Sequence, residues 1–317
     1  MHILVTGAAG FIGSAVTRAE LERGNDVVGI DCFIDYYPRP IKENNLRPLR
    51  SNPRFRFLEQ SLLAVDLEGL LDGVEIIYHQ AAQAGVRASW GRDFEIYTLN
   101  NIQATQRLLE ACKGRNLRLV YASSSSVYGN CEHLPMNEDH PTAPISPYGV
   151  TKLAAEHLAR LYWLNFGVPT VSLRYFTVYG PGQRPDMAFH RLIKAALGGE
   201  EFPVYGDGHQ TRDFTFISDA VAANLGAAER GRPGGIYNIG GGSRVTLNEV
   251  IALLEKIVGR KVRVRYHEPQ KGDVRHTYAD TSRARRDFGY QPRAGLEEGL
   301  AAEVEYIRDV ILPLEKV

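Results

Sequence analysis

The chain has 317 residues, 44% of them hydrophobic and 23% charged, which is enough to bury a sizeable core and suggests two domains or one large one. Lysine plus arginine and aspartate plus glutamate number 37 each, so the formal net charge is zero, which excludes a broad basic surface for nucleic acid or an acidic membrane. No apolar stretch reaches the roughly 18 residues that a membrane-spanning helix needs.

Cysteine content and the opening residues bear on the cellular compartment. Cys32, Cys112 and Cys131 are widely spaced, and their spacing matches no metal site. The opening MHILVTG enters an apolar run directly, without the basic segment and long apolar core of a secretory signal. We therefore expect a cytoplasmic protein with reduced thiols, which binds no metal, nucleic acid or membrane.

Strands and helices alternate along the first half of the chain. Apolar runs predict strands at 2–6, 26–30, 75–79, 118–122 and 170–174, and helical patterns lie between them at 12–23, 100–113 and 148–166. This order is typical of parallel strands joined by helical crossovers. We predict an α/β fold, with a Rossmann-type doubly wound parallel sheet over residues 1–173.

The texture of the sequence changes after Arg174. The segments YGPGQRP and VYGDGHQTRDF are rich in glycine, proline, arginine and aromatic residues, which is typical of loops around a ligand. A helix at 247–258 and a strand at 261–266 follow. We expect a smaller C-terminal α/β substrate domain, mainly 174–317, with about 214–237 returning to the Rossmann domain.

A glycine-rich turn follows the first predicted strand. Gly7, Gly10 and Gly13 permit a tight turn, close approach of the backbone to a pyrophosphate, and close helix–strand packing, with the helix N-terminus facing the phosphates. Asp31 ends the second strand, where a carboxylate accepts hydrogen bonds from a ribose 2′-hydroxyl and repels a 2′-phosphate. The turn therefore predicts NAD rather than NADP; a structural turn beside a surface aspartate is the alternative.

A tyrosine and a lysine are spaced for proton transfer. Tyr148 and Lys152 follow Pro147 at a predicted helix start and share one helix face. A free phenol has a pKa near 10, so activity at neutral pH requires about 4 kcal/mol of phenolate stabilisation. The Lys152 ammonium, a cationic nicotinamide and the helix N-terminus suit this task, and Ser124 offers a hydroxyl to the same proton path. Alone the pair fits a plain amphipathic face; with the glycine turn upstream it predicts catalysis.

Together these motifs resemble the extended short-chain dehydrogenase/reductase family, and within it the nucleotide-sugar epimerases. The matching segments run nearly end to end: VTGAAGFIG, YHQAAQAGVR, NNIQATQRLLEAC, SSSSVYG, SPYGVTK, LRYFTVYGPGQRPDMAFHRLI, GDGHQTRDF and GDVRHTYAD. The resemblance implies tightly held NAD, a C-terminal domain for the UDP-sugar, and a homodimer formed through the helices at 100–113 and 148–166.

The resemblance also implies roles for individual residues. Proton transfer falls to Ser124, Tyr148 and Lys152. The implied cofactor contacts, with Tyr175 beside the nicotinamide, are Gly7, Gly10, Phe11, Ile12, Gly13, Asp31, Ala81, Ala82, Asn100, Lys152 and Tyr175. The predicted substrate contacts are Arg87, Ser125, Ser126, Thr177, Arg184, Phe189, Tyr205, Gln210, Arg212 and Arg275. Arginines can neutralise a diphosphate and a tyrosine can cover a uracil ring, although each arginine singly also fits a surface ion pair.

Two departures from related sequences refine the prediction. Many relatives have Gly-Asp where this chain has Gln60-Ser61, so the expected contact with the adenine amine is weakened. Dehydrating relatives carry Asp-Glu after the catalytic serine, and decarboxylating relatives carry a glutamate just before Val-Tyr-Gly. Here Ser125 and Ser126 occupy these positions and supply no extra acid or base, which leaves epimerisation.

The sugar is predicted from the group at its C6. Galactose epimerases carry Arg-Tyr-Phe-Asn, whereas Thr177 replaces that asparagine here. With Ser125 and Ser126 it would form a hydroxyl cluster able to hold a carboxylate. We therefore favour interconversion of UDP-glucuronate and UDP-galacturonate. The alternatives are UDP-glucose/galactose 4-epimerase and, less favoured, UDP-glucuronate decarboxylase or a catalytically silent NAD-bound sensor.

Overall fold

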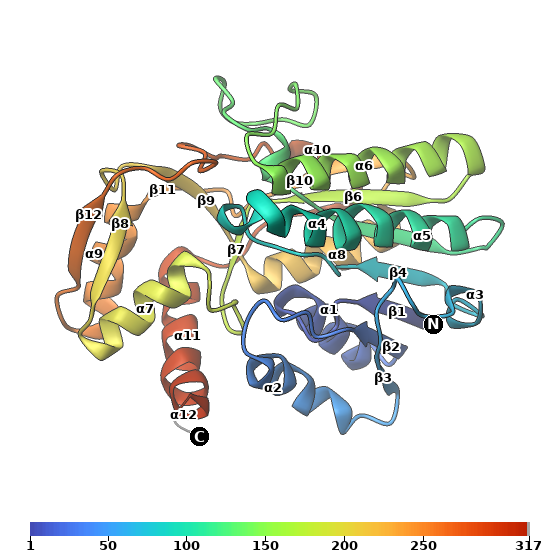
Figure 1. The fold of residues 1–317 in the computed structure, drawn as a ribbon, viewed down its shortest axis with the longest axis horizontal. Helices are drawn as coiled ribbons and strands as arrows, with labels where there is room; N and C mark the ends of the chain where they lie inside the picture. The colour runs from blue at the N-terminus through green and yellow to red at the C-terminus, as the bar shows by residue number, and fades with distance from the viewer. Residues whose placement is uncertain (316–317) are drawn as a thin grey trace.

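A sheet of seven parallel strands forms the centre of the protein in the computed structural model, which describes residues 1–315 (Figure 1). The strand order is β10-β6-β5-β4-β1-β2-β3. Because the order runs outward in both directions from β1 and β4, the sheet is doubly wound, and the predicted fold class is confirmed. The strands are β1 (His2–Thr6), β2 (Asp26–Asp31), β3 (Phe55–Glu59), β4 (Ile76–His79), β5 (Arg118–Ser124), β6 (Thr170–Tyr175) and β10 (Gly235–Ile239).

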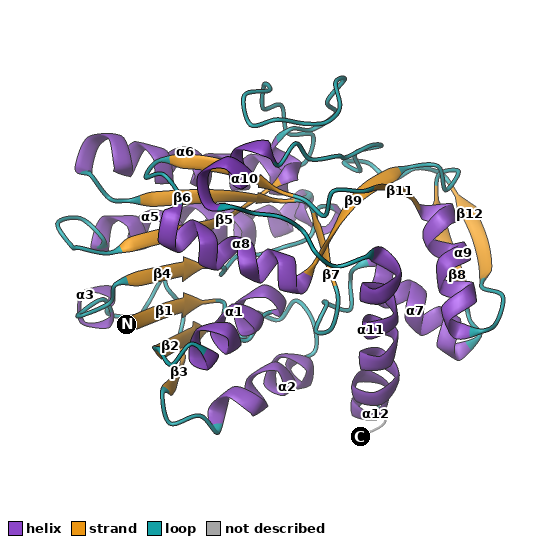
Figure 2. Ribbon diagram, turned by 180° about the vertical axis from the view of Figure 1, so that it is seen from behind, coloured by secondary structure: helices purple, strands orange, loops and turns teal. Residues whose placement is uncertain are grey.

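Helices cover both faces of this sheet (Figures 1 and 2). One face carries α1 (Phe11–Glu22), α2 (Arg39–Arg50), α8 (Ile217–Arg230) and α10 (Ser282–Phe288). The other carries α3 (Leu67–Leu70), α5 (Ala104–Ala111) and α6 (Pro147–Phe166). The elements α8 and β10 overlap the range 214–237, and α10 packs against both from farther along the chain.

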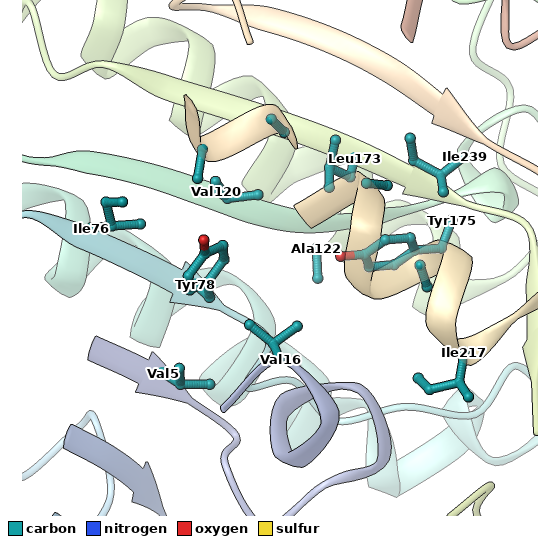
Figure 3. Packing of buried hydrophobic residues seen from close by; sticks show 14 of the residues in the cluster. Val5, Val16, Ile76, Tyr78, Val120, Ala122, Leu173, Tyr175, Ile217 and Ile239 are labelled. Carbon is teal, nitrogen blue, oxygen red and sulfur yellow. The ribbon is translucent and has the colours of Figure 1, made fainter. Parts of the chain in front are cut away.

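Apolar side chains from the strands fill the space under these helices. Val5 of β1 and Leu173 of β6 are fully buried, and Figure 3 shows them in one cluster with Val16 of α1 and Ile217 of α8. Strands buried on both faces need apolar residues at successive positions, which explains the continuous apolar runs of the sequence. Each buried aliphatic side chain of this size stabilises the fold by about 1.5–3 kcal/mol.

The helix predicted over 100–113 is interrupted. A short helix, α4 (Phe94–Tyr97), is followed by the π-helix η3 (Thr98–Gln103) before α5 begins. Within η3, the side chain of Asn101 is buried, accepts a hydrogen bond from the backbone N–H of Gln83 at 2.7 Å, and donates to the hydroxyl of Thr151 at 3.0 Å. The wide turn thus orients an amide inward, which is a common use of π-bulges near functional sites.

A smaller lobe is built around a separate core (Figure 1). Its helices are α7 (Ala188–Gly198), α9 (Leu247–Val258), α11 (Leu296–Tyr306), the π-helix η5 (Ile307–Ile311) and α12 (Leu312–Leu314). Helix α7 packs on β8 (Glu201–Tyr205), which pairs in parallel with β12 (Arg263–His267), and α9, α11 and η5 pack around α7 in the same core. A three-stranded sheet of β7 (Thr177–Tyr179), β9 (Thr211–Phe216) and β11 (Arg244–Thr246) connects the lobe to the large sheet. Short 3-10 turns are η1 (Arg87–Ser89), η2 (Gly91–Asp93) and η4 (Ser125–Val127).

Within residues 1–315, no helix has the length and apolar character to cross a membrane.

A buried ion pair joins α6 to the sheet. Arg174 of β6 donates to both carboxylate oxygens of Glu156 on α6, at 2.6 and 2.9 Å, and both side chains are almost completely buried. The hydroxyl of Ser123 donates to the same carboxylate at 2.6 Å. This network fixes the position of α6 over β5 and β6, because a buried charge must keep its partners.

We expect Glu156→Ala to lower the free energy of unfolding by about 3–5 kcal/mol, since it leaves the Arg174 guanidinium buried without a counter-charge. Urea unfolding followed by circular dichroism measures the change. The double variant Glu156→Ala/Arg174→Met should recover a large part of the loss. Lys256→Ala, which breaks the exposed pair with Glu297, is the control and should cost about 1 kcal/mol or less. Equal losses of unfolding free energy in Glu156→Ala and Lys256→Ala would contradict this account.

Candidate active site

Two adjoining cavities lie at the carboxyl ends of the central strands. The small cavity has a volume of about 200 Å³ and the large cavity about 1520 Å³. Phe11, Tyr36, Tyr148, Tyr175 and Arg184 line both, so one continuous space runs from the glycine turn into the smaller lobe. The edge of a doubly wound sheet where the strand order reverses is the usual ligand site of this architecture.

The glycine turn borders the small cavity. Gly7 has a φ of +70°, and an added Cβ at Gly13 would lie 2.1 Å from the Gly7 carbonyl oxygen, so neither position tolerates a side chain. Helix α1 starts directly after Gly10, with no side chain capping its first N–H groups. Those N–H groups are therefore available to a phosphate, and the turn fits the pyrophosphate of a dinucleotide.

Asp31 sits at the end of β2 and also lines the small cavity. Its carboxylate accepts hydrogen bonds from the backbone N–H of Phe33 at 2.9 Å and of Ala9 at 3.2 Å. Burial raises the pKa of Asp31, and these N–H groups together with the nearby Lys42 ammonium oppose the rise. Ser61 lies on the same wall, where its hydroxyl accepts a hydrogen bond from the backbone N–H of Leu63. The ribose end of the cavity is thus built as a dinucleotide requires.

Every predicted cofactor residue lines the small cavity. The set is Gly7, Gly10, Phe11, Ile12, Gly13, Asp31, Ala81, Ala82, Asn100, Lys152 and Tyr175. The hydroxyl of Tyr175 lies between two amides that the sequence analysis missed, 2.9 Å from the Asn224 oxygen and 3.3 Å from the Gln80 nitrogen. Gln80 follows β4 and Asn224 lies on α8, so no local pattern links them.

The predicted proton-transfer residues converge where the two cavities meet. Ser146 caps α6 by accepting a hydrogen bond from the Gly149 N–H at 3.1 Å, so Tyr148 lies in the first turn of the helix. The amine of Lys152 is buried and donates to the carbonyl of Ala122 at 2.7 Å. Burial, assisted by the charge of Arg184, lowers the pKa of Lys152 to about 7.

The environment of Tyr148 differs from the sequence-based expectation. Burial raises the pKa of its phenol, while a hydrogen bond with Ser124 and the charge of Arg184 act in the opposite direction. A cationic nicotinamide in the small cavity would act in the same direction as Ser124 and Arg184 and favour the phenolate.

All ten predicted substrate residues line the large cavity. They are Arg87, Ser125, Ser126, Thr177, Arg184, Phe189, Tyr205, Gln210, Arg212 and Arg275. Phe189 also belongs to the core of the smaller lobe, where its ring lies 4.4 Å from that of Phe214.

Cations gather at the end of the large cavity nearest β8. Arg87 pairs with Asp273 at 2.7 Å and its guanidinium lies 4.4 Å from the centre of the Tyr205 ring. Arg212 donates to two backbone carbonyls, and burial lowers the pKa of its guanidinium. Arg275 pairs with an exposed aspartate. The buried guanidinium of Arg212 suits the diphosphate of a nucleotide, and the Tyr205 ring suits its base.

Sequence reasoning missed a bridge across the junction of the cavities. Arg184 pairs with Asp186 at 2.9 Å, and the hydroxyl of Tyr36 donates to the same carboxylate at 3.0 Å. Burial disfavours the charge on Arg184, yet Asp186 raises its pKa above the ordinary value. Tyr36 and Asp186 are far apart in sequence, so only the fold reveals the contact.

A family model described as the NAD dependent epimerase/dehydratase family matches residues 3–240. The chain belongs to this family. The assignment confirms the predicted resemblance, the enzyme class and the NAD dependence. The glycine turn and the Tyr148–Lys152 pair belong to two of the segments that carried the resemblance, VTGAAGFIG and SPYGVTK.

Full-length relatives narrow the comparison. The chain is 47% identical to the uncharacterized UDP-glucose epimerase YtcB of Bacillus subtilis, over 97% of this chain and 98% of that protein. It is 36% identical to the UDP-glucuronate 4-epimerase of Thermodesulfobacterium geofontis, over 98% and 97%. The crystal structure of Bacillus cereus UDP-glucuronic acid 4-epimerase with UDP-glucuronic acid and NAD matches with a TM-score of 0.96 and 46% identity, covering 98% of this chain and 100% of that one.

We expect Tyr148→Phe to reduce turnover of the sugar nucleotide by about 10²–10⁴-fold, because the variant retains the ring but loses the group that exchanges the proton. NAD retention, measured on the cofactor released by heat denaturation, should be unchanged. Tyr162→Phe is the control: it lies on the same helix, bonds Glu110 instead of the cavity, and should keep its turnover. Undiminished turnover in Tyr148→Phe would refute the assignment.

Proposed function

We propose that this protein is a UDP-glucuronate 4-epimerase, which interconverts UDP-glucuronate and UDP-galacturonate with bound NAD. The observation that carries the proposal is the group of hydroxyl residues Ser125, Ser126 and Thr177 lining the large cavity beside Tyr148. Hydroxyl donors suit a sugar carboxylate, and the serines stand where related dehydratases and decarboxylases carry an acid or base. The similar enzymes of B. cereus and T. geofontis support the same sugar.

The proposed reaction needs a proton exchanged at the sugar 4-hydroxyl. Bound NAD would accept a hydride from C4 and return it. Tyr148 takes the proton from O4 and gives it back, with Ser124 hydrogen-bonded to the same phenol. Lys152, held by the carbonyl of Ala122, lies in the small cavity, where it can contact the nicotinamide ribose and keep the local charge positive.

Inversion at C4 requires the sugar to present both faces to Tyr148. The large cavity, at about 1520 Å³, exceeds the roughly 300–1,000 Å³ of ordinary ligand pockets, and leaves room for the 4-keto sugar to turn. Arg87, Arg212 and Arg275 at the far end would hold the diphosphate meanwhile. A 4-keto uronic acid loses CO₂ readily. Because Ser125 and Ser126 supply no acid or base at this place, the intermediate keeps its C6 carboxylate.

A second candidate is UDP-glucose/galactose 4-epimerase, which the name of the B. subtilis relative favours. The two candidates share Tyr148, Lys152 and the arginines, and differ only in the group at C6. Thr177 decides between them on physical grounds, because a threonine hydroxyl beside two serines rewards a carboxylate more than a hydroxymethyl group.

Proton NMR of the purified protein with UDP-glucuronate, and separately with UDP-glucose, tests the proposal. We expect signals of UDP-galacturonate to grow until the two uronates reach equilibrium, with no net consumption of NAD. UDP-xylose or a 4-keto pentose would contradict the interpretation of Ser126. Turnover of UDP-glucose alone would contradict the carboxylate site and favour the second candidate.

Two variants of one residue sharpen this test. Thr177→Val removes the hydroxyl with little change of shape, and should lower kcat/KM for UDP-glucuronate by about 10- to 100-fold, the loss of a hydrogen bond to a charged group. Thr177→Ser retains the hydroxyl and should keep most of the activity. Equal activity of the two variants would show that the hydroxyl does not hold the substrate.

We also propose that the protein is a cytoplasmic homodimer. Several apolar side chains on α6 and the preceding helical segment are exposed: Ile96, Leu99, Val150, Leu161, Leu164 and Phe166. Ile96 and Leu99 lie on α4 and η3, which both pack against α6, so these residues mark an apolar surface of the kind that a second subunit covers. The cytoplasm suits Cys32, Cys112 and Cys131, which are free thiols.

Light scattering after gel filtration tests the dimer. We expect the mass of two chains for the wild type, and of one chain for Leu164→Glu, because a charge at this position, 63% exposed in the single chain, would be desolvated in the interface. Tyr266→Glu places a charge at another exposed ring, on β12, and should leave the dimer intact. A wild-type chain that elutes as a monomer at micromolar concentration would refute the proposal.

A further inference from the structure

Glu303 is a carboxyl group enclosed in the smaller lobe, outside both cavities. It lies on α11 with no exposed surface. One carboxyl oxygen, Oε2, accepts a hydrogen bond from the backbone N–H of Gly180 at 2.8 Å. The other, Oε1, has no partner within the described part of the chain, and no ion pair engages the group there. A buried acid without a cation is costly, so a packing role alone gives no reason for it.

Helix α11 is docked closely where Glu303 makes its contact. Gly299, one turn earlier on the same face, lies against Tyr179 and Phe216; an added Cβ would come within 2.4 Å of the Tyr179 hydroxyl. Gly299 and Glu303 therefore press one face of α11 onto the end of β7, where the chain leaves that strand at Gly180.

Residues 180–187 form a loop that leads from this contact to the active site. Gly180 has a φ of +124°, and its carbonyl accepts a hydrogen bond from the N–H of Gln183 at 3.0 Å. Gln183 in turn donates to the carbonyl of Val178 at 3.0 Å, which closes the turn. Arg184 follows immediately, pairs with Asp186, and lines both cavities.

We infer that Glu303 is a positioning residue for the epimerisation: it anchors Gly180 from inside the smaller lobe and so holds Arg184 at the junction of the two cavities. The inference rests on the proposed function. The consequence for the chemistry is direct, because the charge of Arg184 acts on both Tyr148 and Lys152. Displacement of the loop would move Arg184 relative to Tyr148 and Lys152 and so alter proton transfer, while the glycine turn and Asp31 at the far part of the small cavity stay in place.

The surroundings of Glu303 make this anchor sensitive to pH. Burial raises the pKa of Glu303 to about 8, and the Gly180 N–H opposes the rise. Glu303 acts on Tyr179 of β7, and Asp219 on α8 and Glu298 on α11 act on the same tyrosine; none of these groups is a cation. Hydration lowers the free energy of an ionised carboxylate. Ionisation of Glu303 therefore favours movement of its side chain toward water and away from Gly180.

The raised pKa of Glu303 also determines how the stability of the fold changes with pH. The folded pKa lies above the unfolded value of 4.5, so the folded state binds the proton more tightly. The stabilisation is complete below pH 4.5 and is lost as the pH rises through about 8. Over that range the folding equilibrium constant falls by up to about tenfold per pH unit from this group.

The comparison of wild type with Glu303→Gln tests the anchor. The amide keeps the shape and the acceptor but cannot ionise. We expect equal kcat at pH 7, and above pH 8 a decline of wild-type kcat, up to about tenfold per pH unit, that Glu303→Gln lacks. The Lys152 titration remains in both proteins and cancels in the ratio. Glu298→Gln, an exposed change on the same helix, is the matched control and should follow the wild type.

A second variant separates positioning from simple stability. Glu303→Met fills the buried site without an acceptor for Gly180. We expect it to remain folded, with a urea midpoint below that of wild type by no more than one lost hydrogen bond explains, and to lower kcat about tenfold while NAD retention stays unchanged. Activity of Glu303→Met equal to wild type, or superimposable pH profiles of wild type and Glu303→Gln, would overturn the inference.

A substrate-free measurement separates this inference from the proposed function. Urea midpoints of wild type relative to Glu303→Gln should fall from pH 5 to pH 8, whatever sugar the enzyme uses, and a constant difference would overturn the inference. The kinetic comparison uses whichever UDP-sugar the NMR experiment shows to be turned over. Failure with UDP-glucuronate alone therefore counts against the proposed sugar and not against Glu303.

Discussion

The position of α6 over β5 and β6 is the constraint on which the active site depends. Tyr148 and Lys152 occupy the first two turns of this helix, so a shift of α6 moves both. The bidentate pair between Glu156 and Arg174, joined by Ser123, ties the helix to the carboxyl ends of two adjacent strands. The same edge presents Ser124 to the phenol and the Ala122 carbonyl to the amine of Lys152. Structural and catalytic contacts thus share one short segment of β5.

Burial works against every charge that the reaction needs. It raises the pKa of the Tyr148 phenol and lowers that of the Lys152 amine, and so opposes both the phenolate and the ammonium. Arg184 counters part of this for the phenol, and it holds its own charge through Asp186. The chain therefore supplies a dry, preorganised site, in which the positive charge of the oxidised cofactor completes the balance.

Recognition of the substrate divides between two kinds of group. Arginines surround the nucleotide end, where Arg87 and Arg275 form partly exposed ion pairs with Asp273 and Asp207. Uncharged hydroxyls line the sugar end, with Ser125 and Ser126 on η4 and Thr177 on β7. In the proposed epimerisation, this separation would let the sugar turn while the nucleotide stays bound.

The sequence by itself determined the features that depend on local patterns. Apolar runs predicted five of the seven strands of the large sheet within one or two residues, and missed β3 and β10. The glycine turn and Asp31 predicted NAD, and the Tyr148–Lys152 spacing predicted the proton-transfer pair, because each pattern depends on neighbours in the chain. The tertiary structure decided what depends on distant partners or burial. It brought Tyr36 to Asp186, Asn224 to Tyr175 and Glu303 to Gly180, and it placed the Lys152 amine against the Ala122 carbonyl. No periodicity or spacing encodes such contacts, since the pKa of a side chain is set by solvent exclusion and by charges that meet only once the chain has folded.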